Sequence, residues 1–250
     1  MITKNFHQLK AEVQRHVEAV RVEQGGYLTC FIDCLSGGVD NPACIEREYG
    51  IPRMISRIAE SIFEGLPPGE APEFLAALLD AIECNGKDLS RIGWKFLAAE
   101  LRALPTVLAE TQAVVAPVIA GMDRLANGLG WPAHEAESAS KAAAAYAYAI
   151  TRASAADAAT AAWAAHADSA AAWSAYAAAA CADWADDAAL ATNYAELAAE
   201  LAADSATFAA RAFQATALAD GDPILARRRQ RDTLLQLIKE APITQETTHD

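Results

Sequence analysis

The chain has 250 residues and a formal net charge of −13, from 33 acidic and 20 basic side chains. A nucleic-acid-binding protein needs a basic surface along the phosphates, so this charge balance argues against that class. Hydrophobic residues make up 53% of the chain, and the length suffices for one large core or two smaller ones without disulfides or metals.

The first 132 residues predict a series of amphipathic helices joined by short turns. Apolar side chains recur at helical spacing, and groups of Gly, Pro, Asn and Asp interrupt them. The first helix starts at Thr3 or Asn5 and ends before Gly25. The further predicted helices cover residues 51–63, 72–84, 88–104 and 106–127. The short apolar run at 27–35 fits a strand or a helix, and a helix is favoured because no partner strand is predicted elsewhere. Asp40-Asn41-Pro42 predicts a loop, and Pro117 is expected to kink the last of these helices because it removes a backbone donor.

Apolar residues within these helices define their inward faces. One face holds Met54, Ile55, Ile58 and Ile62, and another holds Ile92, Phe96, Leu97, Leu101 and Leu104. Residues that share a helix face in this way are expected to lie in the core.

Residues 133–220 contain no glycine and no proline, and 44 of these 88 positions are alanine. Alanine has the highest intrinsic helix propensity, so this segment is predicted to be helical. A single helix of this length would extend about 130 Å, so we expect about two to four antiparallel helices instead. Candidate breaks are Thr151, Asp168-Ser169, Thr192-Asn193 and Asp204-Ser205.

The bulky and acidic side chains of this segment fall on different sides of a helical projection. Trp163, Trp173 and Trp184 lie on one side, and most of the acidic residues lie on the other. We therefore predict an all-α protein with a helical domain at 1–132 and an alanine-rich helical bundle at 133–242. A last helix, starting near Pro223, is expected to cap this bundle, and residues 243–250 form a flexible tail.

Several groups of polar residues are candidate sites. Cys30, Cys34 and Cys44 lack the ligand spacing of structural zinc sites, and buried thiols or a thiolate cluster remain open for them. His166 and Asp168 point to different helix faces. Carboxylates four residues apart, such as Asp183 and Asp187, lack the Glu-x-x-His partner of helical metal centres. We expect no cofactor and no metal, and the sequence carries no catalytic motif.

The candidate partner-binding residues form an acidic group and a basic group. The acidic group consists of Asp183, Asp186, Asp187, Glu196 and Glu200, and the basic group consists of Arg227, Arg228, Arg229 and Arg231. The arginines are suited to an acidic partner or a phosphate, to the acidic faces of this same chain, or to water.

Two further features resemble known sequences. One is the block from Tyr49-Gly-Ile-Pro through Ile62-Phe-Glu-Gly-Leu-Pro67 to Asp88-Leu-Ser90. The other is the alanine-rich tract dotted with Trp and Tyr and followed by Arg-Gln-Arg-Asp-x-Leu-Leu-x-Leu-Ile before Ala-Pro. Together they resemble a loose group of uncharacterised alanine-rich proteins of bacteria, phages and prophages. The resemblance implies a bacterial or phage origin and brings no site residues.

The expected function is a non-enzymatic interaction or assembly protein, because long and chemically plain helical surfaces are suited to docking or self-association. One alternative is an acidic inhibitor, of the anti-defence or toxin-neutralising kind, that acts on a basic site of a partner. Another is an enzyme whose site leaves no linear trace. The odd number of cysteines and the polar N-terminus predict free thiols in the cytoplasm, and no run is long and apolar enough to predict a membrane span.

Overall fold

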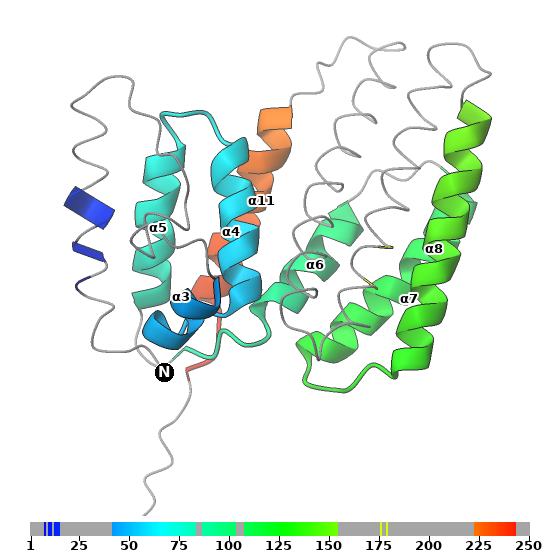
Figure 1. Ribbon diagram of the computed structural model, residues 1–250, viewed down its shortest axis with the longest axis horizontal. Helices are drawn as coiled ribbons and strands as arrows, with labels where there is room; N and C mark the ends of the chain where they lie inside the picture. The colour runs from blue at the N-terminus through cyan, green and yellow to red at the C-terminus, as the bar shows by residue number, and fades with distance from the viewer. Residues whose placement is uncertain are drawn as a thin grey trace, which may run out of the picture.

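The computed structural model describes residues 8, 10, 11, 13–15, 42–83, 87–103, 108–154, 176, 179 and 223–243. Within these residues the regular structure is helical, as Figure 1 shows, and the all-α prediction is confirmed. The one extended pairing in this part of the chain is an isolated bridge between Lys87 and Ile243. The helices are α3 (Pro42–Tyr49), α4 (Arg53–Gly65), α5 (Ala71–Glu83), α6 (Ile92–Ala103), α7 (Ala109–Ala126), α8 (Ala133–Ser154) and α11 (Pro223–Lys239).

The described helices pack in a row. Helix α4 contacts α3, α5 and α6, and α11 packs against α4, α5 and α6. At the other end of the row, α6 contacts α7 and α7 contacts α8, so α7 and α8 lie on the right in Figure 1. The outer sides of these two helices therefore form the far edge of the described structure.

The core lies where α4, α5, α6 and α11 meet. The predicted inward faces are confirmed: Ile55, Ile58 and Ile62 are fully buried, and Met54 is partly buried against them. Ile92, Phe96, Leu97 and Leu101 are also buried, whereas Leu104 lies outside the described residues. Phe74, Leu75 and Leu78 of α5 complete this core with the largest fully buried side chains of that helix.

The C-terminal helix belongs to this core. Helix α11 contacts α4, α5 and α6, and the expected capping of the alanine-rich bundle stays a prediction because most of that bundle lies outside the described residues. The physical reason for these contacts is the apolar face of α11, on which Ala226, Leu234 and Ile238 are buried. The predicted domain boundary at residue 132 stays a prediction. Two helices that follow this boundary contact helices that precede it: α11 contacts α4, α5 and α6, and α8 contacts α7.

Two helix ends differ from the sequence-based expectation. Helix α3 begins at Pro42, where a loop was expected. Proline is favoured at the first position of a helix because its missing N–H would have no partner there. Helix α8 continues through Thr151, a candidate break, to Ser154. Helix α7 includes Pro117, which lies on its exposed side.

The pair of helices α7 and α8 is held by close contacts across a short connection. Gly128 ends the α7 turn with a φ of 73°, a conformation that side chains disfavour. The Trp131 ring then lies directly on Gly121, in the space that a Cβ would occupy. The hydroxyl groups of Thr111 and Tyr146 are hydrogen-bonded at 2.9 Å. These contacts fix the two helices together and leave their outer sides to solvent.

Candidate functional site

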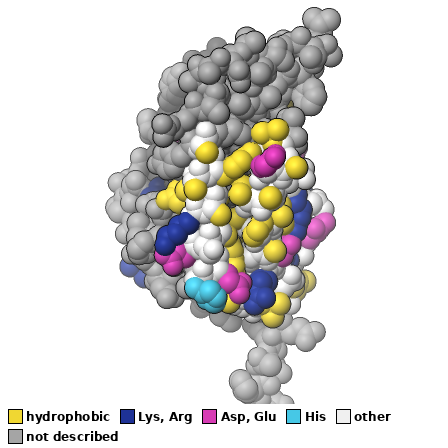
Figure 2. Space-filling model, turned by 90° about the vertical axis from the view of Figure 1, so that its right-hand side faces the viewer, with side chains coloured by type: hydrophobic (Ala, Val, Ile, Leu, Met, Phe, Trp, Pro, Cys, Tyr) yellow, Lys and Arg dark blue, Asp and Glu magenta, His cyan; other side chains and the backbone are white. Residues whose placement is uncertain are grey.

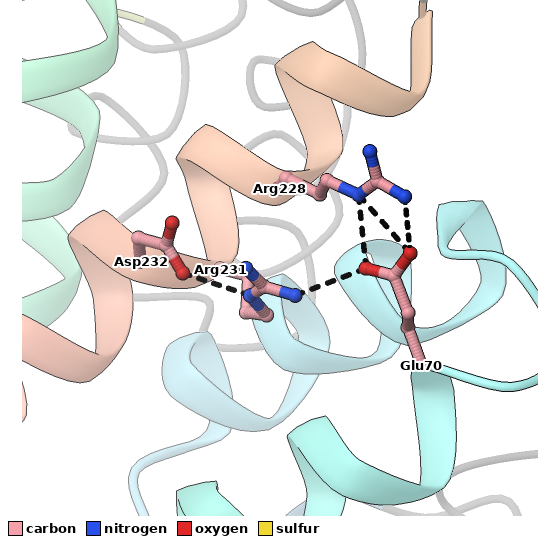
Figure 3. A network of polar contacts seen from close by, with 4 residues as sticks. All are labelled: Glu70, Arg228, Arg231 and Asp232. Atoms are coloured by element: carbon pink, nitrogen blue, oxygen red, sulfur yellow. Dashed lines mark hydrogen bonds and ion pairs between the residues drawn. The ribbon is translucent and has the colours of Figure 1, made fainter.

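Glu70 binds two arginines of α11 at the start of α5 (Figure 3). Arg228 Nε donates to both carboxylate oxygens, at 3.1 and 3.0 Å, and Arg228 Nη2 also donates to Oε1. Arg231 Nη1 lies 3.1 Å from Oε2, and Arg231 Nε donates to Asp232 at 2.8 Å. The hydrogen bonds from Arg228 hold the pKa of Glu70 below its usual value. The network therefore connects α11 to α5 with one ionised carboxylate.

Arg229 reaches a more deeply buried partner. Its Nη2 lies 2.8 Å from Oε2 of Glu100 on α6, and the Glu100 side chain is only 2% exposed. The Arg229 side chain is 35% exposed, and its buried Nε has no hydrogen-bond partner. A buried carboxylate is costly unless a cation stands beside it, so Arg229 is needed wherever Glu100 is ionised.

Arg227 crosses α4 near its C-terminal end. Its Nη1 donates to Ser61 Oγ at 3.2 Å and to Gln230 Oε1 at 3.0 Å. The arginine stem lies over Gly65, where a Cβ would overlap it. Gln230 is fully buried and Ser61 nearly so, which makes this contact part of the interior of the α4–α11 interface.

Lys87 bridges α5 and the end of α11. Its Nζ donates to the backbone oxygens of Ile238 and Lys239, both at 2.9 Å, and lies 3.5 Å from that of Ala81 on α5. The last carbonyl groups of a helix carry partial negative charge and lack partners within the helix. One ammonium group therefore satisfies the C-terminal ends of two helices.

All four candidate arginines of α11 thus contact side chains of the same chain. Of the settings that the sequence left open, the structure shows contacts with the acidic residues Glu70 and Glu100. These pairs join segments more than 120 residues apart, which no local pattern reveals. Binding of a partner through these arginines stays a prediction.

The acidic candidates and most other candidates lie outside the described residues. They are Asp183, Asp186, Asp187, Glu196, Glu200, His166, Asp168, Cys30 and Cys34. Cys44 lies in α3, but its side chain is outside the description. Within the described part of the chain, no three His, Cys, Asp or Glu side chains come together in a group that could hold a metal ion.

The outer side of α7 and α8 is a surface that the sequence reasoning missed. Between Glu110 and Asp123, helix α7 carries no charged residue, and helix α8 carries none between Lys141 and Arg152. We call the exposed uncharged residues of these helices the α7–α8 surface. They are Ala109, Gln112, Ala113, Ala116, Pro117 and Ala120 of α7 and Ser138, Ala142, Ala145 and Ala149 of α8.

Figure 2 shows this side of the molecule, where hydrophobic side chains cover much of the described area and charged side chains lie around them. Two large exposed hydrophobic residues stand at the ends of α7: Leu108 is 41% exposed and Leu129 is 57% exposed. The outer side of a helix in a globular protein usually carries charged and polar side chains. The lack of charged residues between Glu110 and Asp123 was the signal in the sequence for this surface. It is ambiguous because small uncharged residues also occur in buried helices.

Comparison with known proteins gives no relative: no family model, no curated protein and no solved structure matches the chain. The resemblance to alanine-rich bacterial and phage proteins therefore stays a prediction. Within the described residues, no helix is long and apolar enough to cross a membrane.

Proposed function

We propose that this protein is a non-enzymatic interaction or assembly protein of the bacterial cytoplasm, of bacterial or phage origin. It acts through a helical surface that docks another protein surface. The observation that carries the proposal is the α7–α8 surface, which is exposed and lacks charged residues along most of α7. Extended exposed apolar surfaces are typical of interaction sites.

The contacts of the charged residues support the same proposal. The α11 arginines pair with Glu70 and Glu100 and thereby stabilise the packing of α11. On the α7–α8 side, Lys141 pairs with Glu137 and Arg102 pairs with Asp123. The charged groups in these pairs have structural partners, and the small uncharged residues of the outer surface allow another helix to approach closely.

Sedimentation of the fluorescently labelled full chain tests this function. It is measured in buffer and in an extract of the host cells at the same label concentration. We expect sedimentation faster than that of a 26.4 kDa monomer in at least one of the two. Monomeric sedimentation in both, at concentrations up to the solubility limit, would mean that the chain is not an assembly protein.

A further inference from the structure

Five exposed residues of α7 form a seam with charged ends. They are Glu110, Ala113, Pro117, Ala120 and Arg124. Their spacing alternates between three and four residues, which keeps them within about 80° of one another around the helix. This alternating spacing is the one by which two helices pack side by side.

The charges of the seam match those of a second copy that runs in the opposite direction and is centred on Pro117. Glu110 lies seven residues before Pro117 and Arg124 lies seven residues after it, about 10 Å along the helix in either direction. A two-fold axis at Pro117 would therefore bring Glu110 of one copy level with Arg124 of a second copy, twice. Alanine and proline between these ends allow an interaxial distance near the lower limit of about 8 Å.

Both charged ends are accessible. Glu110 is exposed and forms no hydrogen bond or ion pair with any described residue. Arg124 is exposed and uses its Nε to donate to the Gly130 oxygen at 3.0 Å, which leaves its terminal nitrogens oriented by the α7–α8 connection. One charge is thus held in place while the opposite charge lacks a counterpart in the described chain.

We propose that α7 pairs with α7 of a second copy in an antiparallel arrangement, with two reciprocal Glu110–Arg124 ion pairs. This inference rests on the proposed function, for which it names the partner. Helix α7 is about 27 Å long, so the contact buries less than the ~800 Å² per partner of a stable complex. The expected product is a dimer in concentration-dependent equilibrium with the monomer rather than an obligate dimer.

Sedimentation equilibrium of the full chain with charge reversals tests the pairing. Glu110→Lys and Arg124→Glu each create two like-charge contacts in an antiparallel dimer, and each variant alone is expected to dimerise about ten-fold more weakly. An equimolar mixture of the two variants is expected to recover dimerisation, because the introduced lysine of one copy then faces the introduced glutamate of the other. The double variant Glu110→Lys/Arg124→Glu should recover it as well.

The matched control is Gln236→Lys, an exposed substitution on α11 that lies outside the α7–α8 surface and should leave the dimerisation constant unchanged. Circular dichroism establishes that each variant is folded. The proposal is overturned if the parent chain is monomeric at all concentrations, or if the reversals leave its association unchanged. It is equally overturned if the mixture associates no better than each variant alone. Faster sedimentation in cell extract together with any of these results would leave the proposed function standing and show that the partner is not a second copy bound through this seam.

Discussion

Arg229 of α11 and Glu100 of α6 form an ion pair at 2.8 Å, in which the glutamate side chain is 2% exposed and the arginine side chain is 35% exposed. The two residues of this pair therefore differ in their exposure to solvent. Removal of the arginine leaves a buried charge, whereas removal of the carboxylate leaves a cation that water can still reach. This inequality predicts different consequences for substitutions of the two residues.

We predict that Arg229→Met lowers the free energy of unfolding by about 2–3 kcal/mol, below the usual 3–5 kcal/mol because Arg229 is partly exposed. Glu100→Gln should cost about 1 kcal/mol. Urea denaturation followed by circular dichroism measures both. The matched control is Arg102→Met, whose partner Asp123 is exposed and which should cost less than about 1 kcal/mol. Equal losses for Arg229→Met and Arg102→Met would contradict this account of the α6–α11 interface.

The lowered pKa of Glu70 predicts how the free energy of unfolding depends on pH. Its folded-state pKa is held below the ordinary 4.5, chiefly by hydrogen bonds from Arg228. A carboxyl group with a lowered pKa stabilises the fold above its unfolded-state pKa, and this contribution is lost as the pH falls below 4.5 through the folded-state value. Glu70→Gln should therefore lower the melting temperature at pH 7 and have progressively less effect at acidic pH.

Thermal denaturation between pH 7 and pH 3 measures this difference. Glu135→Gln serves as a control, because this exposed carboxylate forms no hydrogen bond or ion pair with any other described side chain. A melting-temperature difference for Glu70→Gln that stays constant across this range would show that the carboxylate charge has no stabilising role.

Substitution of Gly121 is expected to disturb the packing between α7 and the α7–α8 connection. A Cβ at this position would overlap the Trp131 ring, so Gly121→Ala must displace the ring. We expect a loss of about 1–3 kcal/mol in the free energy of unfolding and increased solvent exposure of a tryptophan in the emission spectrum. Gly130→Ala, in the same connection, has open space around its Cβ and should leave both measurements close to those of the parent chain. Similar effects of the two substitutions would contradict the packing described for Trp131.

Loss of the Lys87 ammonium group is expected to cause local fraying at the end of α11. Lys87→Met removes the donor to the Ile238 and Lys239 oxygens and should cost about 1–2 kcal/mol. Hydrogen exchange of the backbone amides near residues 238–243 should become faster, with less change in α7. Lys141→Ala, which removes an exposed helical lysine, is expected to leave this exchange unchanged. Protection of residues 238–243 that is unaffected by Lys87→Met would rule out the capping role.

The helices of the first half were predictable because their apolar spacing is strong. Ile55, Ile58 and Ile62 were assigned to the core from their positions alone and are buried there. Helix α3 differs from the sequence-based prediction because Asp40-Asn41-Pro42 is a typical loop sequence, whereas proline also starts helices. The end of α8 also differs from the prediction, because threonine weakens a helix only slightly and neighbouring contacts decide whether the helix continues.

The contacts of α11 were beyond local sequence reasoning. Glu100 falls one turn after Phe96 on the inward face of α6, so an acidic residue among core positions was a visible signal of a buried partner. The identity of that partner depends on how α11 packs against α6, which helical periodicity leaves open. The α7–α8 surface was missed for a different reason, because alanine is compatible with both buried and exposed positions.

The most direct test of the central claim places charges on the α7–α8 surface of the full chain. Ala113→Glu/Ala145→Glu is compared in sedimentation with Gln8→Glu/Ala11→Glu, which changes exposed positions near the N-terminus on the opposite side of the structure (Figure 1). We predict that the surface variant sediments as a 26.4 kDa monomer in buffer and in extract, while the control associates like the parent chain. Association of the surface variant that equals that of the parent chain would contradict the claim that this surface carries the function.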